Sequence, residues 1–102
     1  MDFSIVLPTR NRRTFLARSI ASLIQQETDA NFEVVVVDNA STDGTPDLLN
    51  DLSPRHKQLR RVEERVPGLL AARHRGVLET NGDILVFVDD DICADPGWLD
   101  SI

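Results

Sequence analysis

The chain has 102 residues, enough for one domain with one modest hydrophobic core. Its 17 acidic side chains outnumber its 11 basic ones and give a net charge of −6. This balance argues against a general nucleic-acid-binding protein, which needs a basic surface. It does not exclude a small phosphorylated ligand, because a divalent metal can supply positive charge locally.

The cellular compartment is indicated by the absence of cysteine pairs, membrane-spanning segments and a signal peptide from the sequence. With one cysteine, Cys93, an intramolecular disulfide is excluded and a reducing compartment is favoured. No apolar stretch approaches the ~20 residues that span a bilayer. Met1-Asp2-Phe3 shows neither the basic nor the apolar region of a signal peptide. We therefore expect a cytoplasmic protein, with membrane association left open for a longer parent chain.

The first elements in chain order are two strands and a helix. Residues Phe3–Leu7 form an apolar run ended by Pro8-Thr9, which predicts a buried strand. After a basic loop, apolar residues at helical spacing predict a helix from about Thr14 to Gln26. Four consecutive valines then predict a second buried strand over Glu33–Val37, because β-branched side chains favour strands.

Arginines cluster between the first strand and the helix that follows it. Arg10, Arg12, Arg13 and Arg18 fit a solvated loop and helix face. That interpretation is the commoner one for such a cluster, but the position directly after a buried strand also allows the arginines to belong to a binding site. Both interpretations stay open at this point.

A polar turn and a short helix follow the second strand. Thr45 is the expected N-cap of this helix and Pro46 its first residue. Asp43 is expected to stabilise the turn by an Asx-type hydrogen bond rather than to bind a ligand. Asp38 is different, because it stands at the carboxyl end of a buried strand, where ligands bind in open α/β sheets.

The middle of the chain predicts a weaker strand and a third helix. Gln58–Glu63 has little apolar content, which predicts a strand at the edge of the sheet. Pro67-Gly68 interrupts the chain, and Leu69–Glu79 is predicted as a helix. Asn81-Gly82 is a helix stop signal. Arg73 lies early enough in this helix to point back towards the strand ends.

The strongest sign of chemistry is Ile84–Val88, which runs directly into Asp89, Asp90 and Asp91. Five apolar residues without polar alternation predict a strand buried on both faces. Clustered carboxylates repel one another unless a cation neutralises them, and oxygen ligands suit Mg²⁺ or Mn²⁺. The sequence thus predicts a site for a divalent metal and phosphate. The alternative is a solvated acidic turn.

The order of elements is β-α-β-α-β-α-β, which predicts an α/β fold. We expect a Rossmann-like, four-stranded, mostly parallel sheet with helices on both faces and right-handed crossovers. Neither a Gly-x-Gly-x-x-Gly dinucleotide motif nor a Gly-x-x-x-x-Gly-Lys phosphate loop is present. Bound phosphates would therefore be held by a metal and by side chains.

Together these segments resemble the nucleotide-binding half of family 2 glycosyltransferases with the GT-A fold. The segments that carry the resemblance occur in the family's order and spacing and cover essentially the whole chain. They are Ser4–Arg12, Val37–Thr45, Pro67–Gly76 and Phe87–Asp91. Four ordered segments are a specific signal, whereas a lone Asp-x-Asp would be a weak one.

The resemblance implies roles for particular residues in the nucleotide pocket. Pro8, Thr9 and Arg10 would border the nucleoside. Asp38 would accept a hydrogen bond from the base, typically uracil, and Arg73 would support the pocket.

The acidic triplet corresponds to the family's Asp-x-Asp motif. Asp90 would contact the ribose, and Asp89 and Asp91 would hold the Mn²⁺ or Mg²⁺ that bridges the diphosphate, with Asp91 the expected direct ligand. The implied reaction is inverting transfer of a sugar from a nucleotide-diphosphate sugar, with a UDP-sugar favoured, to an unknown acceptor. The metal would act as a Lewis acid on the leaving phosphate.

Two features depart from the family. His74 stands where the family usually has Asn. The acceptor-binding half and the catalytic base of the family lie beyond the Asp-x-Asp motif, and the chain continues for only eleven residues after Asp91. We therefore expect residues 1–102 to form a single, truncated donor-binding domain, with no catalytic base assigned.

Three alternatives remain. One is a non-catalytic domain of the same fold that binds a nucleotide or a protein. A nucleotidyltransferase is weakened by the lack of any glycine before Gly44, and a receiver domain by the position of the only lysine, Lys57, in a loop. We also expect self-association through an unfinished sheet edge, with Trp98 and the apolar side of the last strand exposed.

Overall fold

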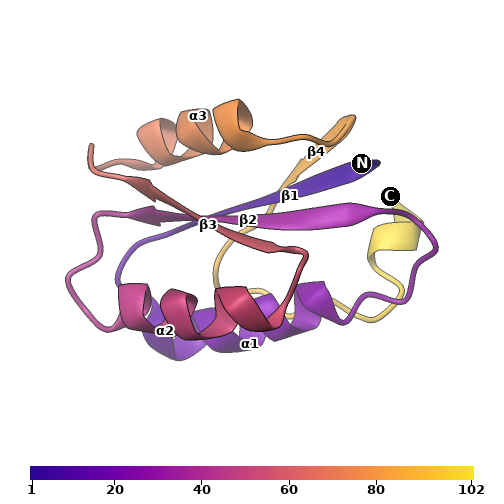
Figure 1. The fold of residues 1–102 in the computed structure, drawn as a ribbon, viewed down its shortest axis with the longest axis horizontal. Coiled ribbons are helices and arrows are strands. Elements are labelled where there is room, and N and C mark those ends of the chain that lie inside the picture. Colours follow the sequence, from indigo (N-terminus) through magenta and orange to yellow (C-terminus); the bar gives the residue numbers. More distant parts are fainter.

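The computed structural model describes residues 1–102 and shows one parallel sheet between two layers of helices (Figure 1). The sheet has the strand order β3-β2-β1-β4, and each neighbouring pair is parallel. The strands are β1 (Phe3–Thr9), β2 (Phe32–Asn39), β3 (Leu59–Glu64) and β4 (Ile84–Phe87). The helices are α1 (Arg13–Ile24), α2 (Thr45–Leu52) and α3 (Leu69–Glu79), with short 3₁₀ turns η1 (Ser53–Arg55) and η2 (Leu99–Ser101).

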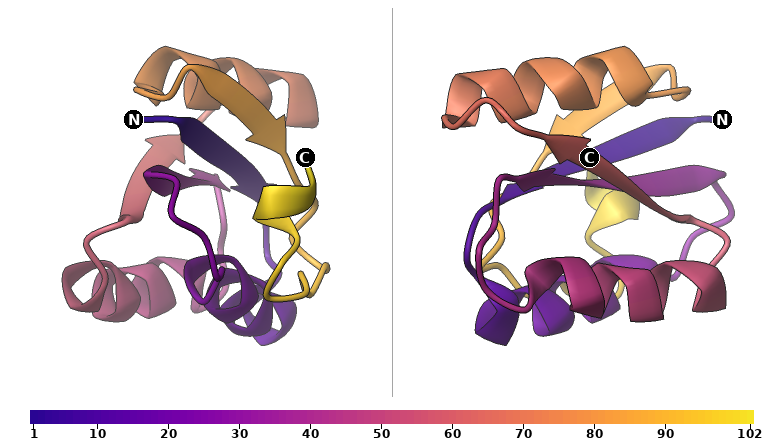
Figure 2. Two further views of the ribbon diagram at one scale, coloured as in Figure 1. Left: turned by 90° about the vertical axis from the view of Figure 1, so that its right-hand side faces the viewer. Right: turned by 60° about the vertical axis from the view of Figure 1, so that its left-hand side comes forward.

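The predicted α/β architecture is confirmed. Helices α1 and α2 lie together on one face of the sheet and α3 lies on the other (Figures 1 and 2). The edge position of β3 is confirmed, and so are the bounds of α3. The first two strands are longer than predicted, because β1 continues through Pro8-Thr9 and β2 through Asp38-Asn39. None of the helices combines the length and the apolar character needed to cross a bilayer.

The core is divided by the sheet into two parts of unequal size. The larger part lies under α1 and α2, where alternate residues of the central strands meet apolar side chains of α1 such as Leu16, Ile20 and Leu23. The smaller part lies under α3 and consists of Val6, Val35, Val37 and Ala72. Because successive residues of a strand point to opposite faces, this division assigns every residue of β1 and β2 to one side.

A glycine lets α3 approach the sheet closely. Gly76 is buried, and a Cβ atom at this position would overlap Cγ1 of Val6. Val6 is β-branched and fully buried, so its side chain has no free space into which it could move. The absence of a side chain at position 76 thus sets the distance between α3 and β1.

The prediction that the last strand is buried on both faces is wrong. Ile84 is 49% exposed and Phe87 is 44% exposed. The physical reason is topological: β4 forms the outer edge of the sheet next to β1, so it has a neighbour on one side only. The apolar run thus identified a strand correctly but not its position in the sheet.

Two further local expectations are corrected. Gly44, not Thr45, is the N-cap of α2, because Thr45 already has helical geometry and bonds to Asp43 through both its amide and its hydroxyl, at 2.9 and 2.5 Å. The turn role of Asp43 is confirmed, and the hydrogen bond from the Thr45 hydroxyl is the main cause that lowers the pKa of its carboxyl. Trp98 is partly buried against the larger core rather than exposed.

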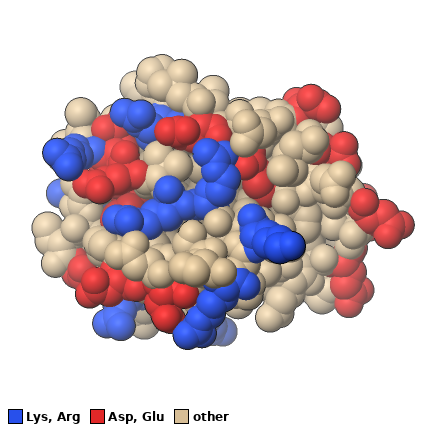
Figure 3. All heavy atoms as spheres, viewed as in Figure 1, with Lys and Arg blue, Asp and Glu red and all other residues tan.

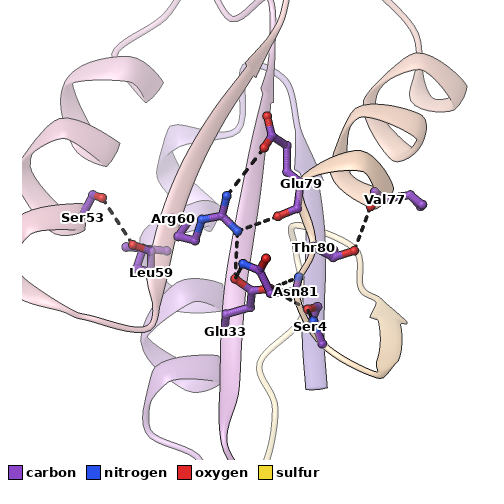
Figure 4. A network of polar contacts seen from close by, with 10 residues as sticks. Ser4, Glu33, Ser53, Leu59, Arg60, Val77, Glu79, Thr80 and Asn81 are labelled. Atoms are coloured by element: carbon purple, nitrogen blue, oxygen red, sulfur yellow. Dashed lines mark hydrogen bonds and ion pairs between the residues drawn. The ribbon is translucent and has the colours of Figure 1, made fainter. Parts of the chain in front are cut away.

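A buried carboxylate joins the sheet to the end of α3 (Figure 4). Glu33, at the start of β2, is 2% exposed and accepts hydrogen bonds from the Ser4 hydroxyl at 2.6 Å and the Asn81 amide at 2.7 Å. Arg60 of β3 pairs with the same carboxylate at 2.9 Å and also donates to the carbonyl of Glu79 at 2.6 Å. Burial alone would raise the pKa of Glu33, but the hydrogen bonds from Ser4, Asn81 and Arg60 outweigh it, so the pKa is lowered from 4.5.

We expect Glu33→Gln to remove this acid-sensitive contribution to stability. A carboxyl with a lowered pKa stabilises the fold above its ordinary pKa, and this contribution is lost as the pH falls through the folded-state value. At neutral pH the variant should lose about 1–3 kcal/mol of unfolding free energy, because buried donors lose a charged acceptor. Urea denaturation should show that the difference in unfolding free energy between the variant and the unmodified protein becomes smaller well below pH 4.5. Glu63→Gln, an exposed acid at the opposite end of the sheet, is the control, and an equal pH dependence in all three proteins would contradict the prediction.

Self-association through β4 stays a prediction, and the structure makes its test specific. The outer edge of β4 has no strand partner, and its apolar side chains are partly exposed. We expect concentration-dependent association in sedimentation experiments, reduced by Ile84→Lys because a charged edge disfavours strand pairing. A monodisperse monomer at high protein concentration would contradict it.

Candidate functional site

A cleft of about 300 Å³ opens at the carboxyl end of the sheet, on the side covered by α3. Four parts of the chain form its walls: the end of β1 with the loop after it, the end of β2, the end of β4 with the residues after it, and the start of α3. The lining residues are Pro8, Thr9, Arg10, Arg12, Asn39, Gly68, Leu69, Ala72, Arg73, Phe87, Val88, Asp89 and Asp90. The cleft therefore lies where ligands of open α/β folds bind.

Most of the residues expected at the site come together here. Pro8, Thr9 and Arg10 enter from β1, Arg73 from α3, and Asp89 and Asp90 from the segment after β4. These positions are separated by up to 82 residues in the sequence. The parallel pairing of β1 and β4 brings them together, because both strands end at the same edge.

A hydrogen bond joins the β1 wall to the acidic segment. The Thr9 hydroxyl donates to Oδ2 of Asp90 at 2.9 Å. Thr9 is buried, whereas Asp90 is half-buried, so the bond is partly shielded from water. It occupies one carboxylate oxygen of Asp90 and leaves the other available for a ligand.

The structure does not bring Asp38 and Asp91 to the cleft. Asp38 follows Val36 on the face that α1 and α2 cover, and it is buried, with Oδ1 accepting from the Ser41 amide at 3.3 Å. Asp91 is exposed and makes no hydrogen bond. Asn39, the next residue of β2, shares the α3 face with Val37 and lines the cleft instead.

Asn39 also fixes the loop between β3 and α3. Its side-chain amide donates to the carbonyls of Glu64 at 3.0 Å and Val66 at 2.7 Å, and its Oδ1 accepts from the amide of Gly68 at 2.9 Å. Gly68 has φ of 128°, a conformation that favours glycine, and it is the N-cap of α3. The Val66 amide donates to Glu64 as well and is the main cause of the lowered pKa of that carboxyl. One buried amide thus holds the start of the helix that carries Arg73.

The arginines of the cleft differ from the other arginines between residues 55 and 75. Arg10, Arg12 and Arg73 have no carboxylate within ion-pair distance. The guanidinium of Arg73 instead lies 5.9 Å from the centroid of the Phe87 ring. By contrast, every arginine from 55 to 65 and also Arg75 is paired with an acidic side chain, and Figure 3 shows the two charges interleaved on one face. The cleft therefore contains three arginines that form no ion pair within the protein.

Arg12 was not singled out by sequence reasoning, which left the arginine cluster open between a solvated face and a site. The structure divides the cluster: Arg10 and Arg12 line the cleft, whereas Arg13 and Arg18 do not. Asn39, Leu69, Ala72 and Phe87 were also missed. The only available signal for Asn39 was its alternation with the valines of β2, which places it on the opposite face from Asp38.

The cleft offers carboxylates to a metal ion but no preformed set of three or more ligands. No group of three or more His, Cys, Asp or Glu side chains is close enough to hold an ion. Asp89 and Asp90 are the acidic residues of the lining. This donor set fits Mg²⁺ or Mn²⁺, since such ions are commonly held by one or two carboxylates together with the phosphates of a substrate.

Most of this chain is matched by glycosyltransferases. The family model described as "Glycosyl transferase family 2" matches residues 4–102. The uncharacterised glycosyltransferase YfnE of Bacillus subtilis is 37% identical over 92% of this chain and 24% of its own length. The crystal structure of S. aureus TarS is 28% identical, with a TM-score of 0.88 over 99% of this chain and 31% of that chain.

A third similar protein has been solved with ligands. It is the mannosyltransferase PcManGT from Pyrobaculum calidifontis in complex with GDP-Man and Mn²⁺, which is 32% identical, with a TM-score of 0.77 over 87% of this chain and 27% of that chain. The chain spans a third or less of the length of the relatives it matches. Its fold, its cleft and these matches agree, and the chain belongs to glycosyl transferase family 2.

Proposed function

We propose that this chain is the nucleotide-sugar-binding half of a metal-dependent, inverting glycosyltransferase. The observation that carries the proposal is the cleft, in which unpaired arginines face two aspartates at the carboxyl end of the sheet. A nucleotide diphosphate offers negative charge to arginine and, through a metal ion, to carboxylates. The same cleft offers an aromatic ring, Phe87, and apolar surface from Leu69 and Ala72.

The ligands of similar proteins support this class of donor. TarS has been solved with UDP and with UDP-GlcNAc, and PcManGT with GDP-Man and Mn²⁺. We propose a UDP-sugar as the donor of this chain, with Pro8, Thr9 and Arg10 bordering the nucleoside. We assign no residue of the cleft to binding of the acceptor.

The residues proposed to bind the nucleotide sugar divide into three roles. Arg10, Arg12 and Arg73 attract and orient the diphosphate by charge, which needs no metal. Asp90 accepts from a ribose hydroxyl through the oxygen that Thr9 leaves free.

Asp89 and Asp91 are the proposed ligands of Mn²⁺ or Mg²⁺. The carboxylate of Asp91 is exposed and makes no competing hydrogen bond. When bound, the metal would supply Lewis-acid stabilisation of the leaving phosphate. We assign no catalytic base, which the family resemblance places in an acceptor-binding half.

We expect this chain to bind UDP with Mn²⁺ and to lose at least about tenfold in affinity with EDTA, because the carboxylates and the diphosphate then repel each other. Calorimetric titration of UDP, GDP and dTDP, each with Mn²⁺ and with EDTA, measures this and identifies the base. Asp91→Ala should abolish the metal-dependent part of the affinity. Asp29→Ala, an exposed acid in the loop before β2, is the matched control. No binding of any nucleotide under either condition would refute the proposal for this chain.

The base contact gives a second prediction, because the family resemblance assigns it to Asp38 whereas the cleft is lined by Asn39. We expect Asn39→Ala to weaken UDP binding about tenfold, since it removes a lining group and frees the loop before α3. Asp38→Asn, of equal size on the other face, should change the affinity less than about twofold. The same titrations measure both, with thermal unfolding as the check that each variant is folded. A larger loss in Asp38→Asn than in Asn39→Ala would place the base against Asp38.

A further inference from the structure

One polar face of α1 is not part of the cleft and is largely buried. Ser19 and Gln26 are buried, at 1% and 9% exposure, and Ser22 is half-buried. Their spacing of three and four residues places them on one side of the helix or its C-terminal extension, next to the apolar stripe. Buried hydroxyl and amide groups are costly unless they are hydrogen-bonded, so their partners need to be identified.

All three side chains bond to the backbone of the segment that follows β4. The Ser19 hydroxyl lies 2.8 Å from the carbonyl oxygen of Asp90 and 2.5 Å from that of Ile92, so its single proton is shared between them. Ser22 accepts from the amide of Ala94 at 3.0 Å.

Gln26 makes the last of these contacts and uses all of its polar atoms. Its Nε2 donates to the carbonyls of Ser22 at 3.1 Å and Asp95 at 2.7 Å. Its Oε1 accepts from the amide of Leu99 at 2.7 Å. The backbone amide of Glu27 then donates to the carbonyl of Pro96 at 2.8 Å.

These contacts follow the segment in order. Ser19 holds its start, Ser22 its middle and Gln26 its end, so residues 90–99 run alongside α1 over their whole length. The segment has no helix or strand of its own before η2, and its backbone groups need partners from elsewhere. Ile92, Ala94, Trp98 and Leu99 pack against the larger core from the same segment.

We propose that Ser19, Ser22 and Gln26 are positioning residues for the acidic triplet, and this rests on the function proposed above. β4 ends at Phe87, so the sheet does not fix Asp90 and Asp91. The bond from Thr9 fixes the Asp90 carboxylate, whereas the bond from Ser19 fixes the backbone of the same residue. The polar face of α1 thereby sets where the carboxylates stand relative to the arginines of the cleft.

A purely structural role would also explain buried bonds, and the two roles differ in one measurable quantity. Loss of general stability affects every form of nucleotide binding equally. Loss of positioning affects the part of the affinity that depends on metal, because only that part needs the carboxylates in place. The readout is thus the ratio of UDP affinities with Mn²⁺ and with EDTA.

The experiment uses Ser19→Ala and Gln26→Leu in the full chain, with calorimetric titration of UDP and amide exchange measured by NMR. We expect the Mn²⁺-to-EDTA ratio to fall at least about tenfold in both variants, as for other groups that orient metal ligands. The amides of Ala94 and Leu99 should exchange at least about tenfold faster in Ser19→Ala, although Ser19 contacts neither amide. Gln25→Leu and Ser53→Ala are the matched controls, the first being the exposed neighbour of Gln26 and the second a serine bonded at 3.4 Å to Leu59.

The outcomes separate the two proposals. Faster exchange with an unchanged Mn²⁺-to-EDTA ratio would overturn positioning of the carboxylates, as would unchanged exchange in Ser19→Ala. If the unmodified chain shows no metal-dependent UDP binding, the proposed function fails. The exchange rates then decide by themselves whether α1 holds the acidic segment.

Discussion

The burial of β1 and β2 on both faces is the constraint on which the rest of the structure depends. Helices cover both sides of this central pair, so its interior residues are apolar except for groups that find partners in the sheet. Polar chemistry is consequently confined to the two ends of the strands. At the amino end, Glu33 finds Ser4 and Arg60. At the carboxyl end, Asn39 and Thr9 bond to neighbouring segments, and the arginines form no ion pair.

This separation explains how an acidic protein can offer a positive cleft. The net charge of −6 describes the whole chain, but binding depends on local charge. On the β3 side, arginines and acids neutralise each other in pairs such as Arg60 with Glu33 and Arg75 with Glu64. In the cleft, Arg10 and Arg73 have no such partners, and the nearby carboxylates bond to a hydroxyl or remain free. The distribution of ion pairs, rather than the composition, creates the site.

The sequence was sufficient for those features that depend on neighbouring residues. Runs of β-branched side chains predicted the strands, and Pro67-Gly68 with Asn81-Gly82 predicted the bounds of α3. Ordered motifs predicted most of the cleft. The burial of β4 could not be predicted in the same way, since an apolar strand at an edge has the same composition as one in the centre.

The same limit applies to single residues of the site. Asp38 and Asn39 both lie at the end of a buried strand. Which of them faces the cleft depends only on which face of β2 is covered by α3. A shift of one residue would exchange them. The polar residues of α1 gave no signal either, because their partners are backbone groups more than 60 residues away, and backbone groups have no sequence signature.

The cleft also shows why a parallel sheet alone does not make a site. The sheet aligns the ends of the strands, but the charged groups proposed to bind a donor stand one to four residues beyond those ends or on a helix. Asn39 holds the wall that starts at Gly68, and the bonds from α1 hold the wall that starts at Asp90. Each of these contacts uses a buried side chain to fix the backbone of a distant loop. Without them, the carboxylates and arginines would still be near the same edge, but their separation would vary, and a diphosphate requires a fixed separation to be held by both.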